Sequence, residues 1–253
     1  MQLTLITPYR DRFSHLKNQL DWWTKEQKQQ AEEKIEWFVV HLLPDLDKGA
    51  DSIQDLCEQH QIRYLSMHSP DAFHKTKALN LALQEAQGEW IAAFDVDLLP
   101  VGDTLMRHCQ LAQNSPNFLV TGYRLMAARE TVDVDEMSVA LEESTLGPED
   151  QPTALRKYLL EAERFGVMPL FKRDRLLAIG GWDETFIGWG AEDQDVIERY
   201  LQAHQSLCRC PDLVYLHLKH QQAVGWNCEQ LTASNRNHYY RKHRSQKRQY
   251  LSE

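Results

Sequence analysis

Two carboxylates, Asp95 and Asp97, follow an apolar run at residues 90–94, and Pro100 closes the segment. The run is rich in aromatic and branched residues, which predicts a buried strand. Buried carboxylates are usually paired or bind a metal, because an unpaired charge in the core costs several kcal/mol. Ligands of open α/β sheets gather at the carboxyl ends of strands, so this position suits a binding site. An acidic turn without a ligand explains the Asp-x-Asp pattern alone equally well.

A second group of acids, Glu192, Asp193 and Asp195, opens a stretch that continues with helical spacing of apolar residues. Acids at a helix N-terminus are favourable by about 0.3 to 1 kcal/mol each, which would explain them without a ligand. That explanation does not account for the surrounding glycines or for Trp182 and Trp189. An aromatic face beside carboxylates suits a sugar, because the ring covers its apolar face and the acids bind its hydroxyls.

Two histidines, His217 and His220, lie in the last predicted strand, residues 213–220. A single histidine on a strand is usually a structural residue. Two of them beside Lys219, in a chain that also contains Asp-x-Asp, favour metal ligands instead. Oxygen ligands together with an imidazole suit Mn²⁺ or Mg²⁺.

Polar residues after the first two predicted strands could bind a nucleotide. Arg10 and Arg12 could contact a diphosphate, although they could also face solvent or pair with Asp11. Asp45 could accept a hydrogen bond from a base or a ribose, or it could simply belong to a turn. Two further polar residues near the start of a predicted helix are Lys77 and Asn80.

The candidate site residues must be positioned by the strands and helices of the fold. Through the first half of the chain, these elements alternate regularly. That alternation predicts an α/β fold with a mostly parallel sheet and helices on both faces. The predicted strands cover residues 3–7, 36–43, 62–65, 90–94, 118–123, 166–171 and 213–220. The predicted helices cover residues 52–61, 74–86, 103–112 and 175–179, with others beginning near 13, 152 and 192.

Two segments have unusual charge. Residues 131–150 contain seven acids and no Lys or Arg, which predicts a mobile loop or a short exposed helix. The next helix has Leu155, Leu159 and Ala162 spaced to pack on one face. Residues 236–248 contain six Lys or Arg and no acid, which predicts a solvated or frayed tail. The alternative for this tail is weak contact with anionic lipid or an acidic partner.

Length and composition exclude several classes of protein. A chain of 253 residues forms one large domain or two small ones. It contains no apolar run approaching the roughly 18 residues of a membrane span, and its start lacks a basic leader, so we expect a cytoplasmic protein. Five cysteines without framework spacing fit a reducing compartment as packing residues. The net charge of -9 argues against general nucleic-acid binding.

Four blocks of sequence, taken in order, resemble those of nucleotide-sugar glycosyltransferases of the GT-A fold. The chain is similar to the branch that contains the β-1,4-galactosyltransferases, the polypeptide N-acetylgalactosaminyltransferases and bacterial capsule transferases. The resemblance spans nearly the whole chain and implies a GT-A, Rossmann-like sheet with a C-terminal acceptor-binding part. The blocks are Thr7-Pro8-Tyr9-Arg10-Asp11-Arg12, Lys77-Ala78-Leu79-Asn80, Phe94-Asp95-Val96-Asp97-Leu98-Leu99-Pro100, and Gly180-Gly181-Trp182 with Trp189-Gly190-Ala191-Glu192-Asp193-Gln194-Asp195.

The resemblance implies how the donor is bound. Asp97 matches the metal-binding acid of the Asp-Val-Asp motif, and the resemblance favours His220 over His217 as the imidazole ligand of Mn²⁺ or Mg²⁺. Together with Asp45, the residues expected to bind the nucleotide sugar are Pro8, Tyr9, Arg10, Arg12, Lys77, Asn80, Asp95, Val96, Trp189 and Gly190.

The resemblance also implies an acceptor site. Asp193 matches the base that deprotonates the acceptor hydroxyl, and Glu192 matches the acid that orients the acceptor. Trp182 and Asp195 are expected to complete the acceptor site. The chain departs from the family block at two positions, Ala191 and Gln194, which replace a glycine and an acid. These departures bear on how the acceptor is held.

The predicted activity is metal-dependent, inverting transfer of a hexose or N-acetylhexosamine from a nucleotide sugar, with UDP expected, to a saccharide hydroxyl. The expected setting is surface polysaccharide or glycoconjugate synthesis. A sugar-phosphate nucleotidyltransferase and a non-catalytic carbohydrate-binding protein are the alternatives. We expect a nucleotide-sugar-binding half at residues 1–110, an acceptor-binding and catalytic half at 111–235, and a basic tail at 236–253.

Overall fold

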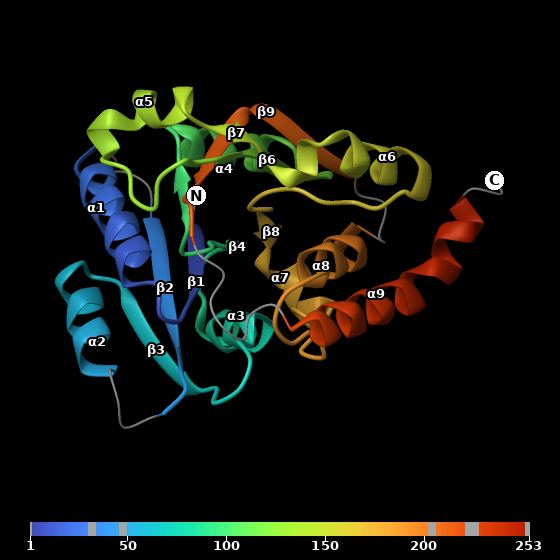
Figure 1. The fold of residues 1–253 in the computed structure, drawn as a ribbon, viewed down its shortest axis with the longest axis horizontal. Helices are drawn as coiled ribbons and strands as arrows, with labels where there is room; N and C mark the ends of the chain where they lie inside the picture. The colour runs from blue at the N-terminus through green and yellow to red at the C-terminus, as the bar shows by residue number, and fades with distance from the viewer. Residues whose placement is uncertain (1, 30–33, 46–49, 202–205, 221–227, 251–253) are drawn as a thin grey trace.

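The computed structural model describes residues 2–29, 34–45, 50–201, 206–220 and 228–250 (Figure 1). Its centre is a five-stranded sheet that is parallel except for the last strand, which pairs antiparallel with its neighbour. The sheet therefore confirms the α/β fold with a mostly parallel sheet. In spatial order its strands are β3 (Arg63–His68), β2 (Lys34–Leu43), β1 (Gln2–Tyr9), β4 (Trp90–Ala93) and β8 (Phe171–Lys172).

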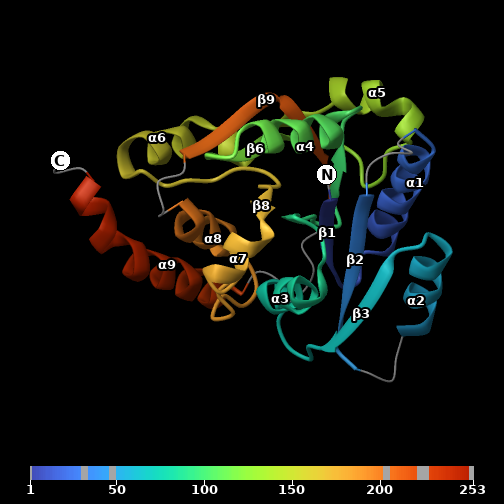
Figure 2. The same cartoon turned by 180° about the vertical axis from the view of Figure 1, so that it is seen from behind.

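Helices cover both faces of this sheet (Figures 1 and 2). Successive side chains of β2 point to opposite faces, so Trp37 and Val39 pack in one hydrophobic cluster while Phe38 and Val40 pack in the other. The first cluster contains side chains of α1 (Phe13–Gln29) and α2 (Ala50–Gln59). The second contains side chains of α3 (Lys75–Glu85), α7 (Arg173–Ala178) and α8 (Glu192–Leu201).

A smaller second sheet brings the C-terminal half against the Asp-x-Asp segment. β9 pairs antiparallel with β5, and this register sets His217 opposite Leu98. α4 (Thr104–Asn114) contributes Leu105, Cys109 and Ala112 to the first cluster. The strands of the second sheet are, in spatial order, β5 (Leu98–Pro100), β9 (Ser206–His217), β6 (Phe118–Met126) and β7 (Thr145–Leu146).

Two predicted strands differ most from the bounds in the structure. The strand expected at 166–171 is reduced to β8, and the residues before it make a single bridge between Val167 and Gly122. Gly166 lies so close to Thr121 that a Cβ atom there would be 2.3 Å from its hydroxyl oxygen. The strand expected at 213–220 begins earlier, at Ser206, and ends at His217.

The acidic segment at 131–150 forms short helices rather than one loop. Most of its side chains are partly or fully exposed, which agrees with the prediction of a short exposed helix. The following helix, α6, was expected to pack through Leu155 and Leu159, but none of its ten residues is buried. The elements are η1 (Val134–Glu136), α5 (Met137–Glu142), η2 (Pro148–Asp150) and α6 (Pro152–Glu161).

Residues 236–248, predicted as a solvated or frayed tail, are helical in the structure. Residues from Glu229 to Tyr250 form one helix, α9, which packs against α8 (Figure 1). The charge count failed to reveal this because Tyr239 and His243, which are buried, alternate with the basic residues. Among the described residues, no helix is long and apolar enough to cross a membrane.

Candidate active site

A cleft of about 750 Å³ lies at the carboxyl ends of β1 and β4 and takes side chains from both halves of the chain. Parallel sheets bind their ligands at this edge. β1 and the segment after β4 form one wall, the start of α8 forms another, and α9 adds Arg236 and Tyr240 at the far end. Of the residues predicted from sequence, the cleft is lined by Pro8, Arg12, Asp95, Val96, Asp97, Trp189, Gly190, Glu192, Asp193, His217 and His220.

One acid and two imidazoles converge at one end of the cleft. Asp97 Oδ1 lies 3.5 Å from His217 Nε2, and Asp97 Oδ2 lies 3.3 Å from His220 Nε2. One ligand atom from each of the three lies within 4.8 Å of the others. The pairing of β5 with β9 brings them together, and the Leu218 amide donates a hydrogen bond to the Asp97 carbonyl at 2.7 Å. The two imidazoles are almost equally close, so the geometry gives no preference for His220.

The charge states in this cluster suit a divalent cation. Burial lowers the pKa of His217 to about 4, although Asp97 acts in the opposite direction, so the imidazole is neutral at physiological pH. Burial raises the pKa of Asp97, but the nearby His217 imidazole and the charge of Arg12 outweigh this and hold that pKa below its usual value. Asp97 Oδ1 and His217 Nδ1 are buried, and neither has a hydrogen-bond partner within the described part of the chain.

A buried lysine holds the other acids of the cleft together. Lys75 Nζ lies 3.0 Å from Asp95 Oδ1, 3.2 Å from Asp193 Oδ2 and 3.6 Å from Glu192 Oε1. Burial alone would lower the pKa of Lys75, but the attraction of the three carboxylates dominates and raises it well above the usual value. Lys75 is therefore a permanent cation that links the Asp-x-Asp segment to the start of α8.

Sequence reasoning missed Lys75 and selected its neighbour Lys77, whose side chain is exposed and outside the cleft. Helical geometry provides the signal that would have found it. Residues four apart share one face of a helix, so Lys75 lies on the face of Leu79, whereas Lys77 points away from it. A lysine in register with the buried stripe of a helix must have partners to compensate its charge.

The two acids at the start of α8 have different surroundings. Glu192 is buried and accepts a hydrogen bond from the Gly190 amide at 2.9 Å. Burial raises the pKa of Glu192 to about 7, with Asp193 raising it further and Lys75 lowering it. The Asp193 side chain is about half exposed and faces the cleft. Trp189 is also half exposed on the wall of the cleft, three residues before α8 begins.

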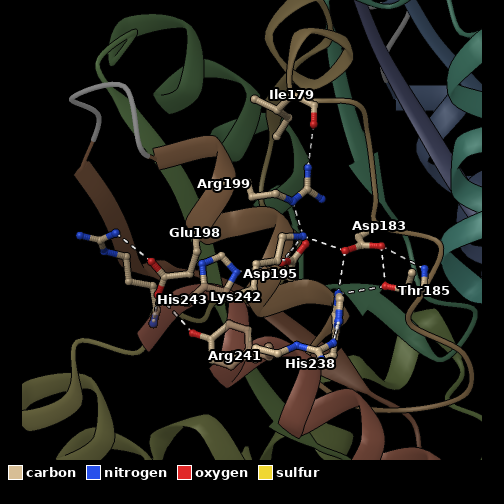
Figure 3. A network of polar contacts seen from close by, with 12 residues as sticks. Ile179, Asp183, Thr185, Asp195, Glu198, Arg199, His238, Arg241, Lys242 and His243 are labelled. Atoms are coloured by element: carbon tan, nitrogen blue, oxygen red, sulfur yellow. Dashed lines mark hydrogen bonds and ion pairs between the residues drawn. The ribbon is translucent and has the colours of Figure 1, made fainter. Parts of the chain in front are cut away.

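Asp195, predicted to hold the acceptor, does not line the cleft. It lies instead in a network of polar contacts (Figure 3). It follows Asp193 by two residues on a helix, so it points to nearly the opposite side, toward the interior. There its carboxylate accepts hydrogen bonds from Arg199 Nε at 2.7 Å and His243 Nε2 at 2.8 Å, and pairs with Lys242 Nζ at 2.9 Å. Asp195 therefore joins α8 to α9.

Two more predicted site residues support a loop instead of lining the cleft. Trp182 is buried against the ring of Phe171, at a centroid distance of 6.0 Å. The Asn80 amide donates to the Trp182 carbonyl at 2.8 Å and accepts from the Trp182 amide at 2.9 Å. These two hydrogen bonds fix the glycine-rich turn that leads toward the acids of α8. This role explains why Asn80 belongs to the 77–80 block.

The remaining predicted nucleotide residues divide between the core and the surface. The Arg10 guanidinium donates to the carbonyls of Leu42 at 3.2 Å and Asp71 at 2.9 Å, so it supports loops at the end of the sheet. Tyr9 is buried and packs on His41 at 4.9 Å between ring centroids. Asp45 is exposed in the bend after β2 and does not line the cleft.

Comparison with known proteins agrees with this arrangement. The family model described as "Glycosyltransferase like family 2" matches residues 10–250. The β-1,4-galactosyltransferase 1 of Mus musculus is 22% identical over 212 residues, which cover 82% of this chain and 39% of the relative. The β-1,4-galactosyltransferase 3 of Homo sapiens is 27% identical over 199 residues, covering 75% and 40%. The chain thus spans about two fifths of the length of these relatives.

A solved structure shares the fold. The mannosyltransferase PcManGT of Pyrobaculum calidifontis, in complex with GDP-Man and Mn²⁺, superposes with a TM-score of 0.60 at 22% sequence identity. The likeness covers 88% of this chain and 58% of that one. The GT-A fold expected from the sequence is therefore confirmed.

Proposed function

The chain belongs to the glycosyltransferase-like family 2, and on this premise we propose that it is a metal-dependent, inverting enzyme. It transfers a hexose or N-acetylhexosamine from a nucleotide sugar, with UDP as the expected nucleotide, to a hydroxyl of a saccharide. The observation that carries the proposal is that one cleft contains both the Asp97, His217 and His220 cluster and the lysine-linked acids Asp95, Glu192 and Asp193.

The first cluster fits a divalent cation. Asp97 and His217 each offer a buried polar atom that has no hydrogen-bond partner among the described residues. A carboxylate with neutral imidazoles is a donor set for Mn²⁺, and Mg²⁺ is the alternative cofactor. When bound, such a cation neutralises the negative charge that develops on the departing diphosphate. Asp97, His217 and His220 would hold it, and Arg12 beside Asp97 adds a fixed positive charge at the same end.

The second cluster supplies the base. Asp193 faces the cleft, and its Oδ atoms can take the proton of an acceptor hydroxyl as that hydroxyl attacks the anomeric carbon. Lys75 holds this carboxylate in place and links it to Asp95 on the donor side. A single base that acts opposite the leaving group implies one displacement, which inverts the anomeric centre.

The rest of the cleft divides between donor and acceptor. Pro8 and Val96 line the wall formed by the sheet, where the nucleotide is expected. Glu192, held by the Gly190 amide, orients the acceptor, and the half-exposed Trp189 offers an aromatic face to a sugar ring. Family membership speaks against the nucleotidyltransferase and the non-catalytic binding protein. Surface polysaccharide or glycoconjugate synthesis in the cytoplasm is the proposed setting.

A panel of nucleotide sugars tests the donor and the metal together. We expect one donor to be hydrolysed slowly without acceptor, with EDTA abolishing the activity and Mn²⁺ restoring it. Calorimetric titration with Mn²⁺ alone should show binding that Asp97→Ala removes. Asp103→Ala, at an exposed residue outside the cleft, is the matched control. Metal-independent turnover would contradict the proposal, and pyrophosphate release from a nucleoside triphosphate and a sugar phosphate would indicate a nucleotidyltransferase instead.

A further inference from the structure

Glu163 is a buried acid that has no cation beside it. It is 3% exposed, and among the described residues no Lys, Arg or His side-chain nitrogen lies within 4.0 Å of its carboxylate. A buried carboxylate is costly unless a cation or hydrogen-bond donors compensate its charge. The other acids that the structure buries all have an ion-pair partner, and they are Asp97, Glu192, Asp195 and Glu198.

Two side chains that line the cleft contact the Glu163 carboxylate. The Tyr240 hydroxyl donates to Oε1 at 2.8 Å, and Gln194 Nε2 lies 3.5 Å from Oε2. Glu163 itself lines the cleft, so its carboxylate lies between side chains of α8 and α9 at the cleft wall. An ionised carboxylate can accept about four hydrogen bonds, and the described residues supply one short contact and one long one. Glu163 can therefore accept further hydrogen bonds from a molecule in the cleft.

The end of α6 explains why Glu163 points inward. Ala162 has a φ of 51°, in the left-handed region, and its amide closes the helix by donating to the Lys157 carbonyl. Residues with a Cβ atom seldom adopt this conformation. Glu161, just before this reversal, is exposed and does not line the cleft. The reversal at Ala162 thus separates an acid that faces solvent from one that enters the wall of the cleft.

Glu163 lies one side chain away from the proposed base. Gln194, which contacts Glu163, directly follows Asp193 in the chain, and both line the cleft. Two residues expected from the sequence to hold the acceptor, Trp182 and Asp195, do not line it. Glu163 therefore supplies, beside the base, a carboxylate that could bind the acceptor in their place.

We propose that Glu163 binds the acceptor sugar by accepting hydrogen bonds from hydroxyls adjacent to the one that reacts at Asp193. The proposal rests on the proposed transferase function, because it names a residue that selects the acceptor. Hydrogen bonds to an ionised carboxylate are strong, and its two oxygens suit two neighbouring hydroxyls. Tyr240 orients the carboxylate through Oε1. The acceptor is thus a saccharide with a free hydroxyl beside the reacting one.

Glycoside titrations followed by saturation-transfer NMR test this binding without turnover. The probes are the methyl glycosides of glucose, galactose, mannose and N-acetylglucosamine, added to the whole chain with UDP and Mn²⁺ and again without them. We expect wild type to bind at least one probe, and Glu163→Gln to bind it about tenfold more weakly, because the charged acceptor is lost. Tyr240→Phe should weaken binding about threefold, since it removes one hydrogen bond that orients the carboxylate. Glu161→Gln is the matched control and should bind like wild type.

Deoxygenated forms of the bound glycoside locate the hydrogen bond. Removal of the hydroxyl that Glu163 binds should weaken binding about tenfold in wild type and less than twofold in Glu163→Gln. Equal losses in the two proteins would overturn the proposal. Failure of wild type to bind any of the four glycosides, under both conditions, would overturn it as well.

A donor titration separates the acceptor from the donor. If Glu163→Gln weakened the binding of a nucleotide sugar and left glycoside binding unchanged, the residue would hold the donor and the proposal would be wrong. Urea unfolding checks that the variants are folded, and Tyr240→Phe tests the same carboxylate with its charge intact. Glycoside binding that depends on Glu163, in a protein that hydrolyses no nucleotide sugar, would support this site while contradicting the transferase function.

Discussion

Helix α8 carries two aspartates, two residues apart, that belong to different kinds of polar cluster. Asp195 is fully buried, and Arg199, Lys242 and His243 all lie within hydrogen-bond distance of its carboxylate (Figure 3). Asp193 is half exposed to the cleft and shares Lys75 with two other acids. The same residue type therefore joins two helices at one position and faces the candidate active site at the other.

The two regions differ in how fully their carboxylates are hydrogen-bonded. In the α8–α9 contact each carboxylate oxygen of Asp195 has a donor. In the cleft, Asp97 Oδ1 and His217 Nδ1 have none among the described residues, and three acids share one lysine. Buried polar atoms without hydrogen-bond partners also occur outside the cleft, for example Trp22 Nε1 and Trp90 Nε1, so the convergence of Asp97 with two imidazoles is what indicates a ligand here.

The largest expected effect is on turnover at Asp193. Asp193→Asn keeps the size of the side chain but cannot take a proton, so we expect kcat to fall about 10³-fold. The free energy of unfolding should change by less than about 1 kcal/mol, because the site is half exposed. Steady-state kinetics and urea titration measure the two quantities. Turnover within a few fold of wild type would remove Asp193 as the base.

The same substitution at Asp195 should give the opposite result. Asp195→Asn leaves Arg199, Lys242 and His243 without the full negative charge that they surround in the interior. We expect a loss of about 3 kcal/mol in the free energy of unfolding. The kcat of the protein that remains folded should stay within about fivefold of wild type. A catalytic loss as large as that of Asp193→Asn, without loss of stability, would place Asp195 in the reaction.

Lys75 and Lys77 both lie on α3, but only Lys75 lines the cleft, and Lys77 is exposed on the surface. Lys75→Gln removes the cation that links Asp95 to Asp193, and we expect kcat to fall about 30-fold with a smaller change in KM, an effect of about 2 kcal/mol. Lys75→Arg should recover part of the rate because it restores the charge. Lys77→Gln, two residues along the same helix, should remain within about twofold. Equal effects at both positions would show that Lys75 is not a positioning residue.

The smallest expected effect is a pH dependence at Glu192. Burial raises the pKa of this acid from 4.5 to about 7 in the folded chain. The folded state then keeps a proton that the unfolded state releases, so stability falls as pH rises from about 4.5 to about 7 and levels off above. Glu192→Gln removes the titrating group, so this pH dependence should disappear. Between pH 5 and pH 8 the free energy of unfolding of the variant should rise by about 1 to 2 kcal/mol relative to that of wild type. Urea unfolding at each pH measures this difference. If the unfolding midpoints of wild type and Glu192→Gln changed with pH in the same way, the raised pKa of Glu192 would be contradicted.

The sequence predicted the fold better than it predicted which way side chains point. Alternating apolar runs indicated the parallel strands β1 to β4, and four residues that the sequence singled out all line the cleft, namely Asp97, Asp193, His217 and His220. The helix at residues 236–248 was not predicted, because charge counting does not register the buried side chains of Tyr239 and His243. The packing expected of α6 also failed, since helical spacing shows which residues share a face but not whether a partner exists to cover it.

The sequence by itself determined the element order and the chemistry available, because hydrophobic periodicity and residue type are local properties. Tertiary structure decided which residues of each motif enter the cleft: Lys75 rather than Lys77, Arg12 rather than Arg10, and Asp193 rather than Asp195. These choices depend on the direction of each side chain about its helix and on the partners that packing brings to it. Asp97 meets His217 only because β5 and β9, more than a hundred residues apart, pair in one register.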